Sequence, residues 1–167
     1  GSGIAGRDYE FVHHLVQEVT YIGIHHRQRR RLHRLIGEAM ESLYADQSAV
    51  VSVLAHHFDA AGEAKKALHY HDLASQRAEA MFAWQEAEEH QVRMLQWLEQ
   101  LDPDCTRADY LRRRGRILAE RAELRYFQAH LAERDADLAA LETLAKSSGD
   151  EDLRLQGLIL RARYLNL

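Results

Sequence analysis

Leu54-Ala55-His56-His57-Phe58-Asp59-Ala60-Ala61-Gly62 places two large apolar side chains, Leu54 and Phe58, four residues apart and ends on a glycine. This spacing puts both side chains on one face of a helix, and Gly62 suits the left-handed position that closes a helix. The next segment carries Ala67 and Ala74 seven residues apart, again on one helical face. Small side chains on one helix allow close packing of a partner helix with large side chains. The stretch therefore predicts a helical hairpin filled by Leu54 and Phe58.

Helical periodicity continues on both sides of this hairpin. Leu32, Leu35, Ile36 and Ala39 follow the i, i+3, i+4, i+7 rule of an apolar helical face. The chain is rich in strong helix formers and has one proline, Pro103, and nine glycines. The expected helices span about 8–24, 27–45, 48–61, 64–82, 84–101, 105–124, 126–147 and 150–166. Only 9–12 could form a short strand, so the prediction is an all-α chain with antiparallel neighbours.

Turn signals separate several of these helices. Asp46 or Ser48 is expected to be the N-cap of the helix that follows. Asp102-Pro103-Asp104 predicts a turn because proline rarely continues a helix. In Ser147-Ser148-Gly149-Asp150, Gly149 is expected to close one helix and Asp150 to start the next.

The spacing of the central pattern resembles the tetratricopeptide repeat. Its residues are Leu54, Phe58, Gly62, Ala67, Tyr70 and Ala74. Ala55 departs from the consensus glycine, and later units do not keep the 34-residue period of that repeat. A second, internal similarity aligns Leu111–Leu118 with Leu153–Leu160 and superimposes Gly115 on Gly157. Chance similarity of two Leu/Arg-rich helices is the alternative. The predicted fold is a right-handed α-solenoid of antiparallel, tetratricopeptide-like helix pairs, with about eight helices in the whole chain and the repeats over 47–167.

Composition excludes several classes. The chain has 167 residues, 46% of them apolar and 29% charged, with a net charge of −4. The single Cys105 rules out a disulfide framework and a Cys-based zinc module. No apolar run approaches a membrane span and no signal peptide is evident, so a cytoplasmic location without membrane contact is expected. Gly1-Ser2-Gly3 is expected to be a cloning remnant.

The N-terminal segments resemble a known family. They are Tyr9-Glu10-Phe11-x-His13-x-Leu15-x-Gln17-Glu18-x-x-Tyr21, then Arg29-Arg30-Arg31-Leu32-His33-x-x-Ile36, then the Leu54–Gly62 stretch. Their order and spacing resemble the region after the ATPase module of bacterial STAND-type signalling proteins, such as large LuxR-type regulators and ATPase-linked adenylate cyclases and kinases. The resemblance covers about 9–100.

The resemblance implies a non-enzymatic arm of a larger signalling ATPase, with a protein, peptide or ligand recognised on the concave face of the solenoid. It implies that 4–46 is a helical remnant of a winged-helix region that contacts an upstream ATPase module. The chain lacks the glycine-rich phosphate-binding motif of that module, and no cofactor is expected. The last helix is apolar on most faces, which predicts truncation at the C-terminus and a homodimer through this helix.

Three other sites are open to a functional interpretation. Arg27, Arg29, Arg30, Arg31 and Arg34 form a basic cluster. It is interpreted as a solvated or docking face, with nucleic-acid binding as the alternative, although residues 61–110 carry ten acidic against five basic side chains. Glu133 and Asp137 share a helical face as a weak acid–base pair.

Eleven histidines raise the alternative of a metal-binding helical bundle. The best ligand spacings are Glu10 with His13, His14 with Glu18, and Glu86 with His90. The motif H-E-x-x-H is absent. Structural or capping histidines are the favoured interpretation, and no metal site is predicted.

Overall fold

The computed structural model describes residues 14–44, 48–101 and 107–165 of the chain. Within these ranges it contains eight α-helices, one 3-10 turn and no strand, which confirms the all-α prediction. The elements are α1 (His14–Gly23), α2 (His26–Leu43), η1 (Ser48–Val50), α3 (Val51–Ala61), α4 (Ala64–Ala80), α5 (Trp84–Gln100), α6 (Arg107–Phe127), α7 (Leu131–Ser148) and α8 (Glu151–Leu165).

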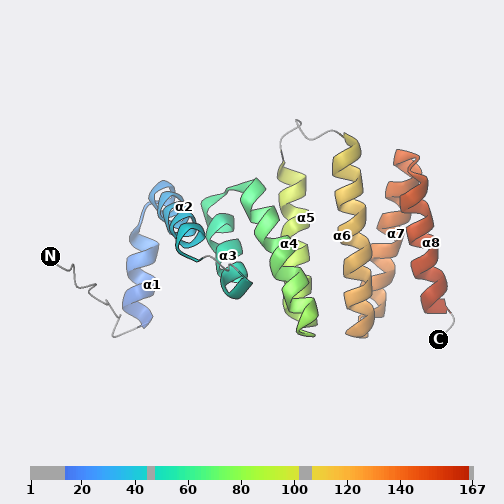
Figure 1. Cartoon of the computed structure of the whole chain (residues 1–167), viewed down its shortest axis with the longest axis horizontal. Coiled ribbons are helices and arrows are strands. Elements are labelled where there is room, and N and C mark those ends of the chain that lie inside the picture. Colours follow the sequence, from blue (N-terminus) through green and yellow to red (C-terminus); the bar gives the residue numbers. More distant parts are fainter. Residues whose placement is uncertain (1–13, 45–47, 102–106, 166–167) are drawn as a thin grey trace, which may run out of the picture.

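The helices form one extended row that runs from α1 at one end to α8 at the other (Figure 1). From α2 onward each helix packs on the next one in sequence, and α6 also packs on α8. Short connections make successive helices antiparallel. Contacts therefore stay between close neighbours in sequence, and no helix is enclosed by the others on all sides.

The buried apolar residues gather in local clusters along the row. One cluster joins α3 and α4 through Leu54, Phe58 and Tyr70, and another joins α4, α5 and α6 through Leu68, Met94, Leu98 and Ile117. Two more lie around Leu124 and around Leu141. The core is thus divided into pieces that follow the helix pairs.

The turn between α6 and α7, which contains no glycine, lies later in the chain than predicted. The helix expected over 105–124 continues to Phe127, and the one expected at 126 begins at Leu131. Ala129 takes the left-handed conformation, with φ of 60°, between them. The His130 amide then donates to the Arg125 carbonyl at 2.8 Å, as in a Schellman cap.

The turn after α4 repeats this geometry. Phe82 has φ of 58°, and the Ala83 amide donates to the Ala78 carbonyl at 2.8 Å. Gly62 makes the same turn with φ of 73°. The break expected at 83, between helices over 64–82 and 84–101, is confirmed, whereas the turn at Ala129 lies beyond the break expected at 125.

The remaining turn predictions had mixed outcomes. Gly149 closes α7 in the left-handed conformation, and Oδ1 of Asp150 accepts from the amides of Asp152 and Leu153, so both expectations are confirmed. Ser48 is not the N-cap of α3. It begins the 3-10 turn, and Val50 precedes the helix without a side-chain cap. The predictions on Asp46, on 9–12 and on 102–104 lie outside the described residues.

None of the helices in the described part of the chain combines the length and the apolar character that crossing a bilayer requires.

Candidate functional site

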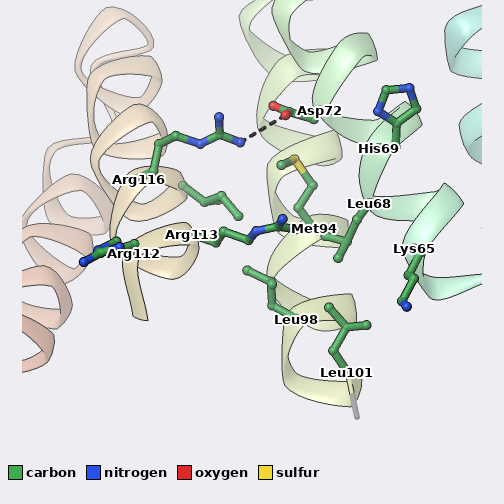
Figure 2. Close-up of a pocket in the computed structure, with 11 residues that line it drawn as sticks. Lys65, Leu68, His69, Asp72, Met94, Leu98, Leu101, Arg112, Arg113 and Arg116 are labelled. Atoms are coloured by element: carbon green, nitrogen blue, oxygen red, sulfur yellow. Dashed lines mark hydrogen bonds and ion pairs between the residues drawn. The ribbon is translucent and has the colours of Figure 1, made fainter. Parts of the chain in front are cut away.

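A groove of about 790 Å³ lies between α4, α5 and α6 (Figure 2). Its lining comes from residues spread over more than fifty positions of sequence. They are Lys65, Leu68, His69, Asp72, Met94, Leu98, Leu101, Arg112, Arg113, Arg116 and Ile117. A volume of this order falls in the range of ligand-binding clefts.

The floor of the groove is apolar. Met94 and Leu98 of α5, and Leu101 directly after it, lie between the two walls in Figure 2. Leu68 of α4 and Ile117 of α6 pack against them in one cluster. Because most of these side chains are already buried by one another, the floor offers a firm surface of limited exposed area.

The walls are charged, and mostly positively. Arg116 of α6 crosses to Asp72 of α4 with an N–O distance of 3.0 Å and ties the two walls together. Arg112 points away from the groove, and its Nε lies 3.9 Å from a carboxylate oxygen of Asp150. Arg113 instead extends over the floor toward Met94.

Arg113 and Lys65 form no ion pair with any residue that the structure describes. Asp72, the single carboxylate of the lining, forms an ion pair with Arg116. The groove therefore holds an excess of positive charge over an apolar floor.

Farther along α4 and α6 the sign of the charge reverses. Burial raises the pKa of Glu120 to about 7, and the nearby carboxylates of Asp72, Glu79 and Glu123 add to this against the attraction of Arg116. Burial likewise raises the pKa of Glu79. The space between α4 and α6 is thus basic at the ends where these helices begin and acidic toward the ends where they finish.

Two pairs of histidines join successive helices. The Nδ1 atoms of His33 in α2 and His57 in α3 lie 2.9 Å apart, and those of His71 in α4 and His90 in α5 lie 2.8 Å apart. A hydrogen bond between two ring nitrogens needs one donor and one acceptor, so at least one imidazole of each pair is neutral.

Their surroundings disfavour positive charge. Burial lowers the pKa of His33, His57 and His90, and a neighbouring histidine lowers each of them further. In the described part of the chain no three His, Cys, Asp or Glu side chains are arranged to hold a metal ion. Glu10 and His13, as well as the side chain of His14, lie outside it. The two described pairs, His33 with His57 and His71 with His90, link successive helices by hydrogen bonds.

The arginines of the basic cluster in α2 have different partners. Nε of Arg30 donates to the Ala61 carbonyl at 2.9 Å and so caps the end of α3. Arg34 lies 3.6 Å from Glu63, and Arg29 sits 5.2 Å from the ring centre of Tyr21. The side chains of Arg27 and Arg31 form no ion pair with a described residue. The capping role of Arg30 was not predicted, since it depends on how α2 crosses α3.

The residues of the repeat pattern lie between the helices. Leu54, Phe58, Ala67, Tyr70 and Ala74 are all buried. Gly115 is buried with the side chain of Leu153 in α8 directly against it, whereas Gly157 faces Leu141 of α7 at ordinary contact distance. The two glycines of the internal similarity therefore meet different neighbours.

Sequence reasoning missed Gly37. This residue of α2 is buried against the ring of Phe58. An isolated glycine inside a predicted helix is the signal that could have identified it, since such a glycine often has a packing reason.

Glu133 and Asp137 do not act as a carboxylate pair. Asp137 is buried and accepts from Arg121 at 2.9 and 2.5 Å and from Arg125 at 2.8 Å. Glu133 is exposed, and its backbone carbonyl accepts from Arg125. Asp137 thus serves as the anion of a buried ion cluster between α6 and α7.

No protein-family model, curated protein sequence or solved structure matches this chain. The function is therefore argued from the geometry: a row of antiparallel helices that carries an open, cationic groove.

Proposed function

We propose that this chain is a non-enzymatic interaction module, a right-handed solenoid of tetratricopeptide-like helix pairs that binds a protein segment in the α4–α6 groove. The observation that carries the proposal is this groove: Arg113 extends over an apolar floor with no carboxylate partner among the described residues. Apolar surface with unsatisfied charge above it favours a partner that supplies the opposite charge.

The packing of the α3–α4 hairpin supports the tetratricopeptide-like part of the proposal. Its large and small residues interlock as the repeat requires, with Phe58 stacked on Tyr70 at 5.3 Å between ring centres. From α2 to α8 each helix packs on the next one in sequence, most extensively α4 on α5 and α6 on α7, and contacts stay between close neighbours. Such arrays present long surfaces for recognition.

The sequence favoured the concave face for recognition. The groove lies between α4 and α6, with α5 as its floor. We therefore place recognition on the α4–α6 side.

We further propose that α1 and α2 dock on the ATPase module of a bacterial STAND-type signalling protein. Apolar side chains stay exposed on these helices, among them Val19, Ile22 and Leu35. Arg27 and Arg31 extend beside them from the start of α2. Apolar patches rimmed by charge are typical of protein contacts.

A peptide-display selection tests the recognition surface. Random 16-residue peptides are selected on the immobilised chain and then compared on His69→Trp, which partly fills the groove, and on His26→Trp, a matched change on exposed α2. Enriched peptides should lose binding to His69→Trp and keep it to His26→Trp. If no peptide is enriched, or if both variants bind every enriched peptide like the parent chain, the proposal is wrong.

A further inference from the structure

We infer that the occupant of the α4–α6 groove is an acidic amphipathic helix of a partner protein, with a narrow apolar stripe flanked by carboxylates. The inference rests on the proposed function and adds the chemistry of the partner.

The charge of the partner follows from the walls. Arg113 on α6 and Lys65 on α4 stand on opposite sides of the floor and have no carboxylate partner among the described residues. Arg116 is held by Asp72 between the same walls. Since the cations come from both walls, one anionic group cannot meet all of them. A helix with carboxylates on both sides of its apolar stripe can pair with the cations of both walls.

The helical conformation follows from the backbone of the groove. Both walls and the floor are α-helices, so their central amide and carbonyl groups are already hydrogen-bonded within each helix. An extended peptide would find no strand edge with which to pair its backbone. A helical peptide satisfies its own backbone and offers only side chains, as helices bound in grooves do.

The strength and salt dependence follow from the floor. Leu68, Met94, Leu98 and Ile117 are each less than one-tenth exposed, so the apolar area left for a partner is small. Most of the selectivity then comes from charge, and binding should weaken as salt rises.

The polarity of the space between α4 and α6 sets the position of the partner. Carboxylates of the partner belong beside Lys65 and Arg113, near the start of these helices. They are repelled near Glu79, Glu120 and Glu123, where burial, with a smaller contribution from the neighbouring carboxylates, raises the pKa of Glu120 to about 7. The acidic residues of the partner should therefore cluster in one part of its helix.

The test uses fluorescence anisotropy with four labelled 14-residue peptides. The first carries a leucine stripe flanked by glutamates. In the others the glutamates become glutamine, the glutamates become lysine, or a central leucine becomes proline. Only the first should bind, and less tightly at high salt. Arg113→Glu and Lys65→Glu should each weaken it by about 5- to 20-fold, whereas Arg31→Glu on α2 should leave it unchanged. The double variant Lys65→Glu/Arg113→Glu should instead bind the lysine peptide.

Circular dichroism confirms that each variant is folded before binding is measured. Equal binding of the glutamine and glutamate peptides, or of the proline and leucine peptides, would overturn the acidic or the helical part of the inference. A partner selected by display that binds the groove without acidic residues would overturn the inference and leave the proposed function intact. If no peptide binds in the groove, both the inference and the proposed function are overturned.

Discussion

The ring of Phe58 in α3 lies against the α-carbon of Gly37 in α2, so that a β-carbon at position 37 would stand 2.8 Å from Cζ of the ring. The Phe58 ring also stacks on Tyr70 of α4, with ring planes 12° apart. One fully buried side chain thus holds three successive helices together. It joins α2 to the hairpin of α3 and α4.

Phe58→Ala should lower the free energy of unfolding by about 3–5 kcal/mol, because a buried aromatic side chain is replaced by a cavity. Urea denaturation followed by circular dichroism measures the loss. Val53→Ala, on an exposed face of the same helix, serves as the control and should cost less than about 1 kcal/mol. Equal losses for the two variants would show that Phe58 does not hold the helices together.

Gly37→Ala should destabilise the protein although alanine is the better helix former. The gain in helix propensity is about 1 kcal/mol, whereas the new methyl group meets a ring that cannot move away, at a cost of about 1–3 kcal/mol. Gly23→Ala, with nothing within 4 Å of its new β-carbon, should leave stability unchanged or raised. A rise in melting temperature for Gly37→Ala would contradict the close contact.

Asp137→Ala should cost about 3–5 kcal/mol, because it leaves the largely buried guanidinium groups of Arg121 and Arg125 without their shared anion. Asp135→Ala removes an ion pair with Arg134 from a carboxylate whose side chain is 64% exposed. That change should cost less than about 1 kcal/mol. Similar denaturation midpoints for the two variants would refute the buried ion cluster.

The histidine pairs should make the protein less stable in mild acid. The folded chain lowers the pKa of His33, His57 and His90 below the ordinary value of 6.5, so the unfolded chain binds more protons near pH 6. Stability is then complete above pH 6.5 and falls as the pH drops from 6.5 toward the lowered values. The groups that face these rings are Tyr21, Arg29 and His56 around His33, and His71, Glu86 and Glu89 around His90.

Melting temperatures at pH 7.5 and pH 5.5 measure this effect. The double variant His57→Gln/His90→Gln should show a smaller fall on acidification than the parent chain. His26→Gln, an exposed position on α2, should show the same fall as the parent. An unchanged fall in the double variant would remove the histidine pairs as its cause.

Glu120 should make the protein less stable as the pH rises, which is opposite to the effect of the histidine pairs. Its pKa of about 7 in the folded chain lies above the ordinary value of 4.5, so its contribution is lost as the pH rises through 7. Glu120→Gln should therefore be more stable than the parent at pH 8, by about 1 kcal/mol because partial exposure of the side chain screens the charge. At pH 4 the two should melt together, and an equal gain at both pH values would contradict the raised pKa.

The helices could be predicted from sequence because they depend on local periodicity, but the inner face of α2 was predicted wrongly. Its expected apolar residues Leu32, Leu35 and Ile36 are exposed, and its buried residues are His33 and Gly37. The large–small pattern of Leu54, Phe58, Ala67 and Ala74 is a property of two adjacent segments, and all four are buried. The turn at Ala129 could not be located, because its left-handed residue carries a side chain that usually avoids that conformation.

The groove could not be predicted from local sequence patterns. Lys65 and Arg113 come from different helices, and only the packing of α5 between α4 and α6 places them on one site. The same holds for Arg30, which belongs to a basic run in sequence but caps the end of a helix in the structure. Their roles depend on crossings between helices that no periodicity encodes.

Because contacts in the described row stay between close neighbours and the buried residues form separate clusters, unfolding need not be a single cooperative event. Opening of α8 disturbs α7 and α6 while leaving Phe58 and its partners in place. Amide hydrogen exchange should then be slowest in the middle of the row and faster toward both ends, as in a one-dimensional chain of coupled units. A partner bound in the groove contacts α4, α5 and α6. It would therefore slow amide exchange in all three helices and make this part of the row more rigid.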